Sequence, residues 1–179
     1  MRYNTGAIRF VTGRMQKLGV GKLNFAALKA AKVNPKTGLA TDYLNHFNEA
    51  SMLLEMAVDT HQMADELLEW VPCDYEQHFE DTNYQGKEIA INAWRAAPHV
   101  KKAHFQTLIN ALNAIIGDAQ EKIRAGDVKS AVGLRVSYVE PLLAAARACI
   151  NGHVEAENMD DSSADQASVD RMFQKAQSA

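Results

Sequence analysis

Apolar residues recur at steps of three or four along most of the chain, which is the spacing of one face of an α-helix. The longest such pattern is TDYLNHFNEASMLLEMAVDTHQMADELLEW, residues 41–70. It predicts one long amphipathic helix. We expect Thr41 to cap its start and Pro72 to end it at Trp70 or Val71. Its apolar face is predicted to contain Tyr43, Phe47, Ala50, Leu54, Ala57, Val58, His61, Ala64 and Leu68.

Further helices are predicted on both sides of this segment. Residues 23–32, 74–86 and 86–97 give short helices, whereas 99–126 and 127–152 give long ones. Gly126 and Gly152 are stop signals, and Asp74 and Asp127 are predicted N-caps. In the two long helices we expect buried side chains that include Val100 and Val136, and we expect Pro141 to kink or split the second helix.

No segment shows the period-two alternation of a half-buried strand, and the abundant Ala, Leu, Met, Gln and Glu favour helix. The predicted fold is all-α, an antiparallel helical bundle of three to four long helices plus short helices, with flexible termini. We divide the chain into a basic N-terminal arm with a short helix (1–38), the bundle (39–153), and an acidic disordered linker with a short amphipathic helix (154–179).

Charge is strongly segregated along the chain. Residues 1–41 contain eight Lys or Arg and no acid, whereas 42–81 contain eleven acids and no Lys or Arg. Arg9, Arg14, Lys17 and Lys22 are therefore candidate partner-binding residues. The favoured interpretation is that this arm docks on the acidic block, within one chain or between the chains of a homodimer. Binding of nucleic acid or of a membrane surface is an alternative that we do not favour.

The two cysteines, Cys73 and Cys149, lie too far apart and in the wrong spacing for a disulfide framework or a CxxC metal site. No apolar run reaches the length of a membrane span, and the N-terminus lacks the apolar core of a secretory signal. We therefore expect no membrane span and a cytoplasmic location.

Metal binding is the sharpest chemical hypothesis. Asp42, His46 and Glu49 share one helical stripe at i, i+4 and i+7, and His78 to Asp81 repeats a His-x-x-acid spacing. Di-iron bundles, however, use Glu-x-x-His, which does not occur in this chain. We expect no metal and no cofactor. Asp42 is expected to interact favourably with the dipole at the start of the helix, while His46 and Glu49 face solvent.

Catalytic motifs are equally scarce. The sequence has no Gly-x-Ser-x-Gly elbow, no dinucleotide fingerprint and no complete phosphate-binding loop. His61 lies among apolar neighbours, so we expect a core histidine that is partnered by Asp65. No catalytic residue is predicted.

The block NPKTGLATDYLNHFNEASMLLEM, together with INGH and the VDRMF tail, resembles a family of small helical bacterial proteins without assigned function. This resemblance implies a helical fold and no catalytic residue. The tail DQASVDRMF is also similar to the response-regulator-binding peptides of chemotaxis phosphatases. That similarity implies partner binding by Val169, Met172 and Phe173, and it implies Asp81 and Gln85 as the acid and amide of such an enzyme.

Together these observations predict a non-catalytic regulatory protein that acts through protein–protein contacts. Its tail is expected to dock as an amphipathic helix in a partner's groove. A chemotaxis-type response-regulator phosphatase is the first alternative, and a metal-binding helical bundle is the second.

Overall fold

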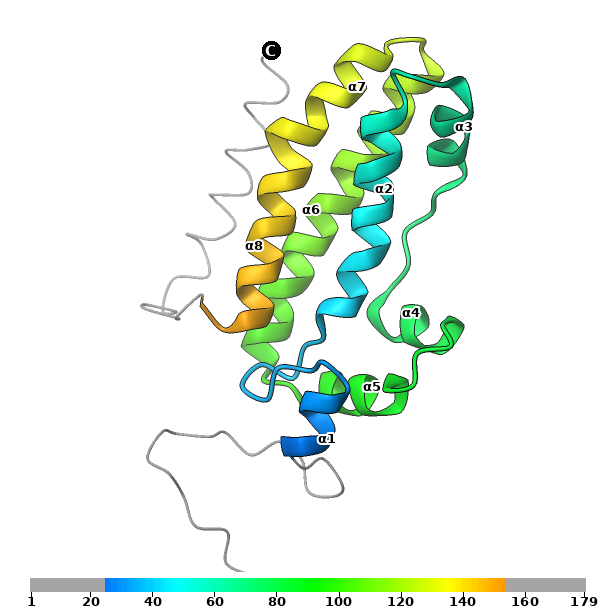
Figure 1. Cartoon of the computed structure of the whole chain (residues 1–179). Coiled ribbons are helices and arrows are strands. Elements are labelled where there is room, and N and C mark those ends of the chain that lie inside the picture. Colours follow the sequence, from blue (N-terminus) through cyan, green and yellow to red (C-terminus); the bar gives the residue numbers. More distant parts are fainter. Residues whose placement is uncertain (1–24, 154–179) are drawn as a thin grey trace, which may run out of the picture.

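The computed structural model describes residues 25–153, which form helices joined by short connections (Figure 1). The predicted all-α class is confirmed, since the only β pairing within 25–153 is a single bridge between Val33 and Ala40. The predicted flexible termini lie outside the described residues. The elements are α1 (Phe25–Ala30), η1 (Thr41–Tyr43), α2 (Leu44–Met56), α3 (His61–Glu69), α4 (Tyr75–Asp81), α5 (Lys87–Ala96), α6 (His99–Arg124), α7 (Val128–Leu134), η2 (Arg135–Val139) and α8 (Glu140–Asn151).

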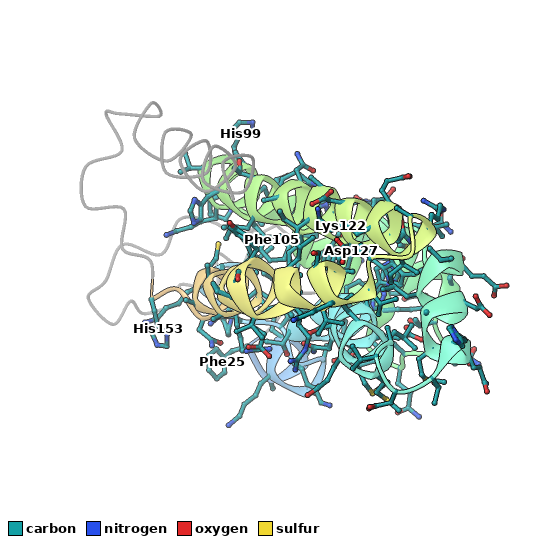
Figure 2. All side chains as sticks on the ribbon, turned by 90° about the horizontal axis from the view of Figure 1, so that it is seen from above. Phe25, His99, Phe105, Lys122, Asp127 and His153 are labelled. Atoms are coloured by element: carbon teal, nitrogen blue, oxygen red, sulfur yellow. The ribbon has the colours of Figure 1, made fainter. Side chains whose placement is uncertain are left out.

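Three lengths of helix form the body of the molecule: α2, α6, and the run from α7 through η2 to α8 (Figure 1). The run from α7 to α8 is antiparallel to both α2 and α6, which point the same way. Phe47, Phe79 and Phe105 are completely buried in the shared core. Phe105 of α6 packs against Tyr43 and Trp94, with ring centroids 6.0 and 6.2 Å away, whereas His99 is exposed and projects outward (Figure 2). Each buried aromatic ring contributes about 1.5–3 kcal/mol through removal of its apolar surface from water.

The single long helix predicted over 41–70 is wrong, because the chain turns between α2 and α3. Thr60 adopts extended backbone and its hydroxyl accepts a hydrogen bond from the Met63 amide, so it caps a new helix. Thr41 is not the N-cap of α2, since it begins the 3-10 turn η1. The predicted stop before Pro72 is confirmed, as α3 ends at Glu69.

The turn between α2 and α3 also overturns two predictions of burial. His61 becomes the first residue of α3 and is exposed, because the new helix turns Ala64 and Leu67 toward the core instead. Val58 lies in the turn and is exposed as well. The apolar spacing therefore continues through the sequence although the helix does not.

Residues 31–40 pack on the end of the bundle near α5, and Leu39 and Ala40 belong to the same core as the long helices. The Thr37 hydroxyl donates to the Ile150 carbonyl at 2.8 Å. The Tyr75 hydroxyl accepts from the Ala40 amide at 2.8 Å. These two buried bonds tie the segment to α8 and to α4.

In the second half of the chain, the helix ends lie close to where the sequence predicts them. The carboxylates of Asp74 and Asp127 cap α4 and α7, and Gly126 and Gly152 have positive φ just after α6 and α8. Val100 is exposed, contrary to expectation, because it lies five residues from Phe105 and so about 140° around the helix.

The segment η2, which precedes Pro141, is a short π-helix. The helix widens here instead of breaking, and the buried stripe steps five residues, from Leu134 to Val139. This step leaves Val136 61% exposed, so its predicted burial is wrong.

Candidate functional site

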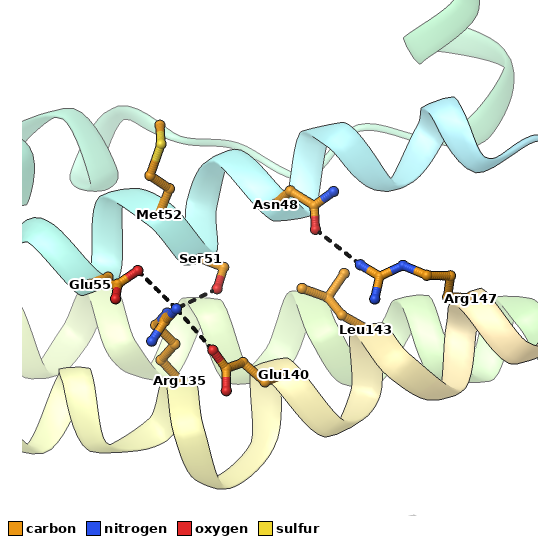
Figure 3. A pocket seen from close by; sticks show the side chains of 8 residues that line it. All are labelled: Asn48, Ser51, Met52, Glu55, Arg135, Glu140, Leu143 and Arg147. Atoms are coloured by element: carbon orange, nitrogen blue, oxygen red, sulfur yellow. Dashed lines mark hydrogen bonds and ion pairs between the residues drawn. The ribbon is translucent and has the colours of Figure 1, made fainter.

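A groove of about 380 Å³ lies between α2 and α8 (Figure 3). The α2 residues of the groove lie at i, i+3, i+4 and i+7, which is one helical stripe, and the step of five from Arg135 to Glu140 on the other wall crosses the π-helix. The lining residues are Asn48, Ser51, Met52 and Glu55 from α2, and Arg135, Glu140, Leu143 and Arg147 from η2 and α8.

Arg135 closes one end of the groove. Its guanidinium donates to the Glu55 and Glu140 carboxylates, both at 2.8 Å, and to the Ser51 hydroxyl at 3.2 Å. The Arg135 side chain is only 19% exposed, whereas the two glutamates are 58% and 47% exposed. Two carboxylates share one guanidinium, so this end carries one excess negative charge.

The other end of the groove is positive. Arg147 is exposed and makes a long contact of 3.5 Å with the Asn48 side-chain oxygen. Within residues 25–153 no carboxylate is paired with it. Between the two ends lie Met52, which is 52% exposed, and the buried Leu143. The groove therefore has an apolar middle and ends of opposite charge.

The candidate metal residues converge only in part. His78 Nε2 lies 3.5 Å from the Asp42 carboxylate, and the His46 and His78 ring centroids are 6.3 Å apart, while Glu49 is exposed. His46 Nε2 is already bonded to the Val71 carbonyl at 2.9 Å. Across the part of the chain that the structure describes, no three His, Cys, Asp or Glu side chains are placed to hold a metal ion.

His46 is half-buried, so the expectation that it faces solvent is wrong. Its ring stacks on Trp70 with centroids 4.6 Å apart, and the Trp70 indole donates to the His46 carbonyl. Burial lowers the pKa of His46, outweighing the opposing effect of its bond to Val71. The ring thus joins α2 to the segment that follows α3, a contact across more than twenty residues that no local pattern indicates.

Asp81 and Gln85 do not share a helix. Asp81 is the last residue of α4, and Gln85 lies in the turn before α5. The Asp81 carboxylate accepts instead from the Gln77 side chain at 2.8 Å. The i, i+4 helical geometry on which the phosphatase alternative depends is therefore not formed.

The acidic block of the sequence extends from η1 to the end of α4, and α3 and α4 follow one another along one edge of the molecule (Figure 1). Asp42, Glu55 and Glu76 are paired with His78, Arg135 and Arg95. The other eight carboxylates are exposed and have no Lys, Arg or His ion-pair partner within residues 25–153. We call these eight the acidic surface: Glu49, Asp59, Asp65, Glu66, Glu69, Asp74, Glu80 and Asp81.

The predicted partner-binding residues Arg9, Arg14, Lys17, Lys22, Val169, Met172 and Phe173 lie outside the described residues. Of the helices within 25–153, none combines the length and the apolar character needed to cross a membrane. Comparisons with known protein families, with curated proteins and with solved structures give no match. The family resemblance therefore stays a prediction.

The sequence identifies the acidic residues but not the groove. Arg135 lies 84 positions from Ser51 and 80 from Glu55, and only tertiary packing brings it to them. The sequence does contain one local signal for this region. Pro141 indicates a disturbed helix close to Arg135.

Proposed function

We propose that the protein is a non-catalytic helical binding protein that docks a basic segment of a protein partner on its acidic surface. The observation that supports this proposal is the set of eight exposed carboxylates that have no cationic partner within 25–153. Like charges held close together repel one another in the free protein. A cationic partner relieves that repulsion, which favours and orients association.

The outer side of α3 defines the chemistry of the partner. Asp65, Glu66 and Glu69 lie within about one turn of one another, and Val71 follows them with its side chain 67% exposed. A segment with several Lys or Arg and one apolar side chain fits these groups. Each exposed ion pair contributes about 0.2–1 kcal/mol, so the affinity should be moderate and should fall as salt rises.

The test is binding of a labelled arginine-rich peptide to the full chain, measured by fluorescence anisotropy at low and at physiological salt. Combining Asp65→Asn, Glu66→Gln and Glu69→Gln should weaken binding about tenfold, since three pairs of roughly 0.5 kcal/mol are lost. The matched control combines Asp118→Asn with Glu121→Gln on α6, where both carboxylates already pair with Lys122 and Arg124.

Equal binding by the triple variant and by the wild-type chain would contradict the proposal, and so would an equal loss in the control. A steep decrease that is confined to the α3 variant would support it. Preference for nucleic acid over the peptide would instead favour the interpretation of the basic arm as a phosphate-binding segment.

The proposal includes the two terminal segments. The basic residues Arg9, Arg14, Lys17 and Lys22 are an internal competitor for the acidic surface, so removing residues 1–24 should increase affinity for the peptide. Val169, Met172 and Phe173 are proposed to dock in a partner's groove. Retention of every partner in a pull-down after removal of residues 160–179 would exclude that role.

We place this binding, and any regulation that depends on it, in the cytoplasm. Support comes from Cys73 and Cys149, which are both free thiols. Free thiols are typical of a reducing compartment. Accumulation of the chain outside the cytoplasm in cell fractionation would contradict this placement.

A further inference from the structure

We infer that the groove between α2 and α8 is a docking surface for a second copy of this chain. This inference is independent of the proposed function, because none of the eight carboxylates of the acidic surface lines the groove. It rests on the opposite charges at the two ends of the groove, with Glu55, Arg135 and Glu140 at one end and Arg147 at the other. A two-fold rotation places the negative end of one copy on the positive end of the other.

The spacing along α8 permits this pairing. Glu140 and Arg147 are seven residues apart, which is about 10 Å along a helix, and both are exposed on the wall of the groove. Ala144 lies between them and is also exposed, so a neighbouring helix can approach closely. When two α8 helices pack antiparallel about Ala144, Arg147 of each copy faces Glu140 of the other.

The groove also has the polarity of an association surface. Met52 of the α2 wall is 52% exposed, Leu143 of the α8 wall is buried, and charged groups occupy both ends (Figure 3). Protein interfaces commonly have an apolar centre, in which Met is enriched, and a polar rim. Met52 of each copy would add apolar surface to that centre.

Charge complementarity favours a second copy of the chain over a partner whose charges are all of one sign. A basic segment would be attracted to Glu55 and Glu140 at one end but repelled by Arg147 at the other. An acidic segment would be attracted to Arg147 but repelled by the two glutamates. A symmetric pair satisfies both ends twice.

The first test is the association state of the full chain, measured by sedimentation equilibrium up to about 1 mM. We expect a reversible dimer, and a monomer throughout this range would overturn the inference. Met52→Asp should raise the dimer dissociation constant at least about tenfold, because it places two carboxylates at the apolar centre. Val100→Asp is the matched control, since Val100 is similarly exposed on the first turn of α6 and lies outside the groove.

The second test exchanges charges between copies. Arg147→Glu and Glu140→Lys should each weaken self-association about tenfold, because each creates two like-charge contacts per dimer. An equimolar mixture of the two variants should restore dimers, since both contacts of the mixed dimer are attractive again. Lys129→Glu on α7 is the control for net charge.

Unchanged association of Arg147→Glu, or a mixture that stays monomeric, would overturn the inference. A dimer that resists every groove variant would place self-association on another surface. Circular dichroism of each variant identifies any loss of fold. Arg147→Glu is the safer variant, because Arg147 is exposed and its polar contact within residues 25–153 is the long one to Asn48.

Discussion

Gly38 offers the sharpest test of how residues 31–40 pack. Its φ is +74°, and a Cβ added there would lie 2.8 Å from the Ala93 carbonyl oxygen and 3.0 Å from the Ala97 Cβ. These neighbours belong to α5 and its C-cap, so no flexible side chain can move aside. Gly38→Ala therefore combines a left-handed backbone with a steric clash.

The expected loss of unfolding free energy follows from these two contributions. A left-handed conformation costs an L-residue about 1–2 kcal/mol, and overpacking of a filled site costs about 1–3 kcal/mol. Gly38→Ala should therefore destabilise the protein by about 2–5 kcal/mol, which is a large part of the stability of a typical domain.

Two other glycines provide matched controls. Gly126 has φ +81° but no atom within 4 Å of its added Cβ, so Gly126→Ala should show the backbone cost alone, about 1–2 kcal/mol. Gly117 lies inside α6, again with open space around an added Cβ, so Gly117→Ala should stabilise the helix by about 0.5–1 kcal/mol.

Urea unfolding at 25 °C provides the measurement, followed by the fluorescence of Trp70 and Trp94 and by far-ultraviolet circular dichroism. Coincidence of the two transitions is required before free energies are compared. A Gly38→Ala loss no greater than that of Gly126→Ala would refute the close packing of this turn against α5. A destabilised Gly117→Ala would refute the open surface of α6 at that position.

Further expectations concern buried polar groups and thiols. Thr37→Val removes the hydroxyl that donates to the Ile150 carbonyl and should cost about 1–3 kcal/mol in urea unfolding, whereas Thr37→Ser should retain most of the stability. Burial lowers the pKa of His46 below its ordinary 6.5, so the unfolded chain takes up a proton at higher pH than the folded chain does. The free energy of unfolding should therefore fall as pH decreases from 6.5 through the folded pKa. His46→Gln should reduce this dependence of the urea midpoint on pH. Burial raises the pKa of Cys149 to about 11, so a thiol reagent should label the half-buried Cys73 first and reach Cys149 only on unfolding; simultaneous labelling would contradict the burial of Cys149.

Helix ends could be predicted from sequence wherever a local contact determines them. Asp74 and Asp127 each bond an amide three residues onward, and Gly126 and Gly152 supply positive φ directly after a helix. These interactions involve near neighbours in the chain. Their signals are therefore complete in the sequence.

The break between α2 and α3 could not be read in the same way. The apolar spacing continues from Leu54 and Ala57 to Ala64 and Leu67, so a continuous helix and a helix–turn–helix have the same pattern. The Thr60 cap is itself a local signal, since its hydroxyl bonds the Met63 amide, but threonine also occurs inside helices, so the pattern alone did not distinguish a cap from a helix interior.

The candidate site was the least predictable part of the molecule. The acid-rich block is evident in the sequence, but which carboxylates are paired depends on Arg95 and Arg135, both far along the chain. The role of Arg135 also depends on the π-helix that positions it, and neither charge nor hydropathy indicates that geometry.

The π-helix at 135–139 makes the run from α7 to α8 tolerant of a change in chain length at this one place. Such a segment is equivalent to one inserted residue in an α-helix, and each residue turns the helix by about 100°. Deleting Ser137 would leave Leu134 and Val139 four residues apart, which is the step of a regular α-helix, so both side chains would stay on the buried face. We expect this deletion to lower the thermal midpoint far less than deletion of Ala114 from the regular helix α6, because only the second deletion changes the phase of a helix.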